Sequence, residues 1–221
     1  MNVVLVVEAI WPLWLIGLVI GGLLTLFVGL ACSPDDKTKR IVVLGSTLSG
    51  KTTLWNQLRN RGVGYDYIAS QQAKVESFWV KSGDHSVKVL ATKDIGGGDL
   101  YVKYYEDLIN ENGTFVYFLI DLTRLQETKQ EVRSRLQLIS KCIKDKKLEN
   151  CGFKILATHF DLYHRKNGNT EDAAKADVLS CLTDKKIKKC SLDIDLDHIM
   201  VVNLLSSSYI DKIKKEITQE G

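Results

Sequence analysis

Residues 45–52 read GSTLSGKT and fit the pattern GxxxxGK(S/T) of a phosphate-binding loop. An apolar run precedes them at 41–44 and a helical pattern follows, which is the strand, loop and helix order that the motif requires. Glycines at both ends let backbone N–H groups turn toward a β-phosphate, and the helix N-terminus favours negative charge. The alternative is a glycine turn that opens a helix without any ligand. The residues expected to contact a nucleoside triphosphate are Gly45, Ser46, Thr47, Leu48, Ser49, Gly50, Lys51, Thr52 and Thr53.

Two side chains of the loop and a second motif predict a magnesium and phosphate site. Lys51 is expected to span the β- and γ-phosphates as a catalytic cation, and the Thr52 hydroxyl to ligate magnesium. A DxxG pattern, Asp94 to Gly97, ends the third predicted strand. The Asp94 carboxylate can reach magnesium through water, and the Gly97 amide can approach a γ-phosphate.

A third motif predicts which base is bound. Residues 158–161 read THFD at the end of the fifth predicted strand, close to the base-reading pattern (N/T)KxD. Asp161 can accept hydrogens from both N1 and the exocyclic amine of guanine, a pairing that adenine cannot make, while Thr158 and His159 complete the motif. The alternative for Asp161 is a loop carboxylate that caps the following turn.

An uncharged apolar stretch covers residues 10–32, long enough as a helix to cross a bilayer core of about 30 Å. Two prolines bracket the stretch, tryptophans stand at its first end, and basic residues follow it, so the positive-inside bias places the rest of the chain in the cytosol. The predicted organisation is a short non-cytosolic N-terminus at 1–9, a transmembrane helix at 10–32, a basic linker at 33–40 and a GTPase domain at 41–221.

Three other interpretations of the 10–32 stretch compete with a membrane anchor. A cleaved signal peptide normally begins with basic residues, which this chain lacks, and its apolar part is usually shorter. The residues before Cys32 fit a lipoprotein signal poorly. A buried core helix is seldom so long and apolar. Export by a signal peptide or as a lipoprotein would also carry the phosphate-binding loop to a compartment without nucleotide.

Composition limits the class of protein further. The formal charge of +3 is too weak to argue for nucleic acid as a partner. The five cysteines are an odd number without a close metal-binding cluster, which suits free thiols in a reducing cytosol better than disulfides or zinc.

Apolar runs alternate with amphipathic stretches beyond the linker, which predicts an α/β fold with a mostly parallel sheet. A turn signal at 82–85 joins the second and third predicted strands into an antiparallel hairpin. In one predicted helix, apolar residues recur at helical spacing while Lys and Arg fill the other face. The predicted strands are 41–45, 74–81, 86–93, 114–121, 153–158 and 198–205, and the predicted helices are 51–60, 99–111, 124–147, 171–183 and 207–217.

With these motifs in order, residues 40–218 resemble the small GTPases of the Ras superfamily, and within them the Arf-like branch. The most specific marks are GSTLSGKTT, DIGGGD and THFD, together with Asp121 at the end of VYFLID. The apolar N-terminal stretch that runs into this domain is similar in layout to the β subunit of the signal-recognition-particle receptor. The resemblance implies a P-loop NTPase three-layer sandwich with a six-stranded sheet and about five helices, magnesium-dependent binding of GTP and GDP, and two nucleotide-sensing switch segments.

The chain departs from the Arf-like pattern at four places. Gly98 stands where the family has a glutamine, and His159 replaces the usual lysine, although an imidazole can still lie over guanine. No threonine lies between residues 62 and 74 to ligate magnesium in the first switch, so Ser70 is the nearest hydroxyl. The last guanine-binding loop is represented by 203–206, with Ser206 as its contact.

The sequence therefore predicts a membrane-anchored small GTPase that acts as a molecular switch or docking platform, with slow intrinsic hydrolysis because Gly98 cannot position water. The expected partners are a protein effector or receptor subunit and an activating protein. The membrane is the endoplasmic reticulum in a eukaryote or the inner membrane in a bacterium. Two alternatives are a pseudo-GTPase that binds GTP constitutively as a receptor subunit, and an ATP-using kinase or ATPase.

Overall fold

The computed structural model describes residues 37–62, 72–182 and 194–219 of this 221-residue chain. The predicted transmembrane stretch at 10–32 and the predicted magnesium ligand Ser70 lie outside the described residues. From Lys37 onward the chain forms one compact unit. No helix within 37–62, 72–182 or 194–219 is long and apolar enough to cross a membrane.

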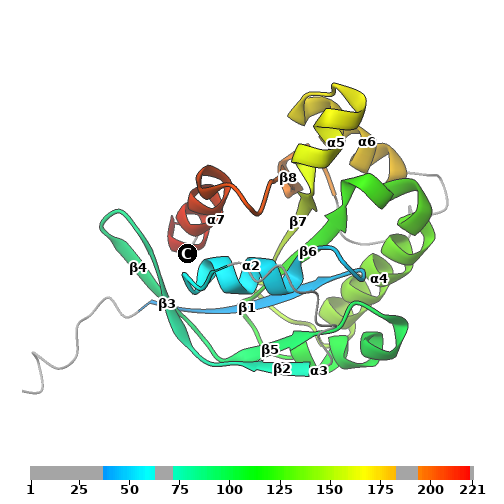
Figure 1. Ribbon diagram of the computed structural model, residues 1–221. Helices are drawn as coiled ribbons and strands as arrows, with labels where there is room; N and C mark the ends of the chain where they lie inside the picture. The colour runs from blue at the N-terminus through cyan, green and yellow to red at the C-terminus, as the bar shows by residue number, and fades with distance from the viewer. Residues whose placement is uncertain (1–36, 63–71, 183–193, 220–221) are drawn as a thin grey trace, which may run out of the picture. The chain divides into compact units, whose positions relative to one another are not determined.

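A six-stranded sheet forms the centre of the unit, in the order β3-β4-β1-β6-β7-β8 (Figure 1). Four neighbouring pairs are parallel and only the β3 and β4 pair is antiparallel, so the predicted mostly parallel sheet is confirmed. Parallel pairing brings the carboxyl ends of β1, β6 and β7 to one edge of the sheet, where ligands bind in open α/β folds. The strands are β1 (Thr38–Gly45), β3 (Phe78–Ser82), β4 (His85–Val89), β6 (Thr114–Asp121), β7 (Gly152–Thr158) and β8 (Ile199–Val201).

The predicted hairpin is present but is divided into two segments. Beyond β3 and β4, the strands β2 (Gln72–Val75) and β5 (Thr92–Ile95) pair as a separate two-stranded sheet. The register is shared, because Val75 faces Thr92 just as Phe78 faces Val89. One antiparallel ribbon therefore runs from the sheet edge to the site, where β5 delivers Asp94.

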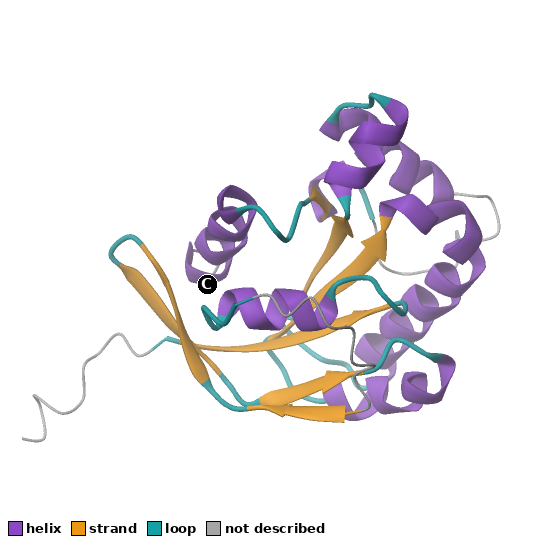
Figure 2. Cartoon of the chain, viewed as in Figure 1, coloured by secondary structure: helices purple, strands orange, loops and turns teal. Residues whose placement is uncertain are grey.

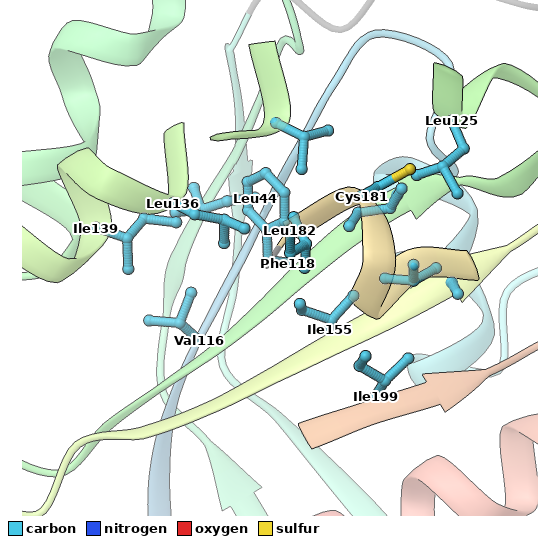
Figure 3. Packing of buried hydrophobic residues seen from close by; sticks show 14 of the residues in the cluster. Leu44, Val116, Phe118, Leu125, Leu136, Ile139, Ile155, Cys181, Leu182 and Ile199 are labelled. Atoms are coloured by element: carbon cyan, nitrogen blue, oxygen red, sulfur yellow. The ribbon is translucent and has the colours of Figure 1, made fainter. Parts of the chain in front are cut away.

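Helices cover both faces of the sheet, as Figure 2 shows. On one face, α2 (Lys51–Leu58) and α7 (Ser207–Gln219) pack over alternate residues of the strands, which include Val43 and Leu119. On the other face, α3 (Tyr105–Leu108), α4 (Leu125–Asp145) and α6 (Glu171–Leu182) pack over the intervening residues, which include Leu44, Phe118 and Ile155 (Figure 3). Each central strand is apolar on both faces, which is the mark of a sheet buried between two helical layers.

The helices differ from the prediction at two places. Six α-helices occur among the described residues, where about five were expected, because α5 (Phe160–Asn167) forms directly after Thr158 and His159. The helix predicted over 99–111 is a 3₁₀ segment (Asp99–Tyr104) followed by the single turn of α3. The strand predicted over 198–205 ends at Val201, since residues 202–206 form the loop that precedes α7.

Candidate nucleotide-binding site

The phosphate-binding loop connects β1 to α2 and depends on its glycines for its shape. Gly45 has φ 142° and Gly50 has φ 92°, both in the region that side chains disfavour. Space is restricted as well, because a Cβ atom on Gly45 would lie 2.4 Å from the Leu119 carbonyl oxygen, and one on Gly50 would lie 2.7 Å from Leu204 Cδ1. The two glycines therefore allow β6 and the 202–206 loop to pack directly against the phosphate loop.

Lys51, the first residue of α2, turns back over the loop. Its ammonium donates to the carbonyl oxygens of Gly45 at 3.1 Å and Ser46 at 2.7 Å, and its side chain is buried. Burial lowers the pKa of Lys51 to about 8; Asp94 and Glu131 oppose this change and Arg135 adds to it. A buried cation held against a glycine-containing loop at a helix N-terminus is suited to a phosphate.

Thr52 and Asp94 meet although 42 residues separate them in the chain. The Thr52 hydroxyl donates to Asp94 Oδ2 at 2.7 Å, while Asp94 Oδ1 is buried and has no hydrogen-bond partner in the described part of the chain. Burial raises the pKa of Asp94, against the lowering effects of the Thr52 hydrogen bond and of Lys51. A hydroxyl oxygen beside a carboxylate with an unused oxygen fits a hard, oxygen-preferring cation such as Mg²⁺.

Gly97 lies directly against the phosphate loop. A Cβ atom on Gly97 would lie 2.3 Å from the Thr47 nitrogen and 2.4 Å from the Ser46 carbonyl oxygen. Gly98 differs, since the atom nearest to a Cβ placed there would be Tyr101 Cδ2, at 4.0 Å. The DxxG glycine is thus required by close packing, whereas position 98 has room for a side chain.

The THFD segment is joined to the phosphate loop by Thr158. This buried hydroxyl lies 3.0 Å from the Ser49 carbonyl oxygen and 3.1 Å from that of Ile120, and His159 Nδ1 also lies 3.0 Å from it. His159 has φ 60° and precedes α5, which places Asp161 in the first turn of that helix. Asp161 Oδ2 accepts from Arg165 at 3.2 Å and the carboxylate is partly exposed, as a base reader must be.

The 203–206 loop, predicted as the last guanine-binding loop, lies against α2. Gln57 Nε2 donates to the Leu204 carbonyl oxygen at 3.0 Å, and Leu204 packs on Gly50. Ser206 directly precedes α7, and its backbone N–H donates to the Asn203 carbonyl oxygen at 3.0 Å. The structure therefore brings the phosphate loop, the 94–98 segment, THFD and the 203–206 loop to one edge of the sheet.

Two buried arginines of α4 were not anticipated. The helical pattern predicted that Lys and Arg occupy an exposed face, but Arg133 and Arg135 are buried. Arg133 Nε donates to the Cys181 carbonyl oxygen at 2.7 Å, within the packing of α4 on α6. Arg135 Nη1 donates instead to the Gly45 carbonyl oxygen at 3.2 Å, in the phosphate loop. The spacing of residues along α4 does not distinguish these arginines from exposed ones, because the groups that they contact belong to other parts of the chain.

Comparisons with known proteins agree with this geometry. Residues 26–208 match the family model described as the ADP-ribosylation factor family. The structure is also similar to that of Arl6 (BBS3), a small GTPase from Trypanosoma brucei with the bound nucleotide analogue GppNp, with a TM-score of 0.56 and 20% identity over 83% of this chain and 96% of that one. The structural likeness shows a shared small-GTPase fold, and the family match covers most of the sequence. The chain belongs to the ADP-ribosylation factor family.

Proposed function

We propose that the protein binds the magnesium complexes of GTP and GDP and acts as a switch or docking platform at the cytosolic face of a membrane, with slow intrinsic hydrolysis. The observation that carries the proposal is the contact of Thr52 with Asp94, which leaves one buried Asp94 oxygen beside Lys51 without a hydrogen-bond partner among the described residues. Thr52 and Asp94 would hold the Mg²⁺ ion, which neutralises phosphate charge when bound. Lys51 and the loop amides would hold the phosphates, and Asp161 would accept from guanine.

Nucleotide titration of the full chain in detergent tests this proposal. A fluorescent GDP analogue should bind, GTP should displace it, and ATP should not. Chelation of magnesium should weaken nucleotide binding in the wild type but have little further effect on Asp94→Ala. Asp107→Ala, which changes an exposed carboxylate of α3, is the matched control and should behave as the wild type. Equal displacement by ATP and GTP would support an ATP-using enzyme instead.

Gly98 favours a second candidate, a pseudo-GTPase that binds GTP without appreciable turnover. In related GTPases a glutamine orients the attacking water, and a glycine cannot. Position 98 has space for a longer side chain, since its nearest neighbour would be 4.0 Å from a Cβ atom. We therefore expect Gly98→Gln to raise single-turnover hydrolysis modestly. Wild-type turnover as fast as that of ordinary Ras-type GTPases without a partner would refute this role of position 98.

An activating protein is expected to supply the catalytic group that Gly98 lacks. A group donated in trans, such as an arginine, accelerates hydrolysis by roughly 10³ to 10⁵ in related systems. Addition of membrane extract to the GTP-loaded full chain should then raise single-turnover hydrolysis strongly. If extract leaves the rate unchanged, the pseudo-GTPase is the better description.

A further inference from the structure

Arg135 is a buried cation placed between the phosphate loop and the segment that follows DIGGG. Its side chain is 3% exposed, and Nη1 donates to the Gly45 carbonyl oxygen at 3.2 Å. Its Nη2 donates to Asp99 Oδ1 at 3.0 Å and lies 2.6 Å from Glu131 Oε1. Buried Tyr105 also lies beside Arg135 and the Gly45 backbone. A buried arginine with these partners is a rigid connection, because its planar fork fixes the direction of each bond.

The two carboxylates that pair with Arg135 have different positions. Glu131 lies one turn earlier on α4 and moves with Arg135 as part of one helix. Asp99 belongs to another segment, and its side chain is 93% exposed. Because Asp99 is exposed to solvent, its carboxylate does not need Arg135 to compensate for burial. The bond to Asp99 therefore joins α4 to the start of the 3₁₀ segment (Asp99–Tyr104).

Gly97 gives the same segment a second attachment to the phosphate loop. Its backbone packs against Ser46 and Thr47 so closely that a Cβ atom would overlap both. Two residues later, Asp99 is held by Arg135, which itself donates to Gly45. Residues 97–99 are thus attached at one end by packing on the loop and at the other by a charged bond to a residue that also binds the loop.

We propose that Arg135 is a positioning residue that couples residues 97–99 to the phosphate loop and thereby strengthens binding of GTP relative to GDP. This inference rests on the proposed nucleotide-dependent function. GTP and GDP differ in the γ-phosphate, and the Gly97 amide is the group expected to donate to it. Holding Gly97 against the loop before the ligand arrives removes an ordering cost that only the triphosphate complex would otherwise bear. Arg135 touches no nucleotide in this account and acts through Gly97.

The test compares affinities for fluorescent GDP and a fluorescent, non-hydrolysable GTP analogue in the full chain in detergent. Asp99→Ala removes the bond at its exposed end and leaves the fold intact, and Arg135→Gln removes it at the buried end. Each change should lower the preference for the GTP analogue by about fivefold or more, the lower range of coupling between sites, with little change in GDP affinity. The double variant should lose no more preference than the larger single change.

Arg133→Gln is the matched control, since Arg133 is a buried arginine of the same helix that donates to the Cys181 carbonyl oxygen, within the packing of α4 on α6. It should leave the preference for the GTP analogue unchanged even where it lowers the melting temperature. An unchanged preference in Asp99→Ala would overturn the coupling, and so would an equal shift in Arg133→Gln. If the wild type binds neither nucleotide, the proposed function fails and the coupling fails with it.

Discussion

At the scale of single residues, we expect base selection to depend on the side chain of Asp161. It lies in the first turn of α5, and Arg165 donates to one of its oxygens at 3.2 Å. We expect Asp161→Asn to shift preference from GTP to xanthosine triphosphate, because the amide reverses the hydrogen-bond pattern at the base edge. Competition by each triphosphate against fluorescent GDP measures the shift. Asp172→Asn on α6 is the control, and unchanged affinities for both triphosphates in Asp161→Asn would show that THFD does not read the base.

We expect Lys51 to make nucleotide affinity dependent on pH. In the empty site its pKa is lowered to about 8, and a bound phosphate, being negative, should raise it. Between these two pKa values the bound form holds more protons than the empty form, so affinity should fall as pH rises above about 8, by at most about tenfold per pH unit. Isothermal titration with GDP at pH 7, 8 and 9 measures this effect.

The variant Lys51→Met provides the control for that pH dependence. It should bind GDP very weakly at every pH, because backbone amides cannot replace the ammonium. It should not melt below the wild type in the absence of nucleotide, since the buried cation is already costly to the empty fold. Normal GDP affinity in Lys51→Met would overturn the assignment of the phosphate loop.

Motif residues could be predicted from the sequence because the chain itself fixes their spacing. Lys51 and Thr52 are set by the loop and helix that contain them, and Asp94 by β5, which ends one residue later. Arg135 could not be identified in this way. Its hydrogen-bond partners Gly45 and Asp99 lie 90 and 36 residues away in the chain, and helical periodicity carries no information on such contacts.

At the scale of elements, the central strands, α2 and α4 were predicted well, whereas α5 and the 3₁₀ segment before α3 were not. In α4, apolar residues at helical spacing mark the face that packs on the sheet. In α5, the eight residues are FDLYHRKN, Tyr163 is buried, and residues 160–162 and 164–166 are at least partly exposed. The helix begins after His159, whose backbone is left-handed. Such a helix is stabilised by its surroundings and lacks a periodic signal.

Close packing between two elements gives a prediction at Gly97. A methyl group there would overlap the Ser46 to Thr47 backbone, and overpacking of this kind costs about 1 to 3 kcal/mol, or roughly 5- to 150-fold in affinity. We expect Gly97→Ala to lose affinity for a GTP analogue and to retain most of its affinity for GDP, because the 94–98 segment must move off the loop. Gly98→Ala, with an open position, should keep both affinities in the same assay. Equal losses in the two variants would contradict this explanation.

At the scale of the whole molecule, the orientation at a membrane stays a prediction. The uncharged stretch at 10–32 and the basic residues after it predict an uncleaved anchor with residues 40–221 in the cytosol. Protease added to sealed vesicles with the cytosolic face outward should therefore digest that region. Protection of the domain, or a mature N-terminus near Cys32, would refute the topology. A transmembrane anchor also implies that nucleotide state cannot release the protein from the membrane, so regulation would act through partner binding.

The contact of Gln57 with Leu204 has a consequence for how the protein is made. These residues are 147 apart in the chain, and ribosomes add about 5 to 20 residues per second. A newly made phosphate loop therefore waits roughly 7 to 30 seconds before the residue that packs on Gly50 has been synthesised. Cellular nucleotide cannot assist the folding of the first half of the domain during that interval, because a ligand stabilises only the state that contains its completed site. The early strands must instead stay soluble without nucleotide, either by pairing with one another or by binding a chaperone.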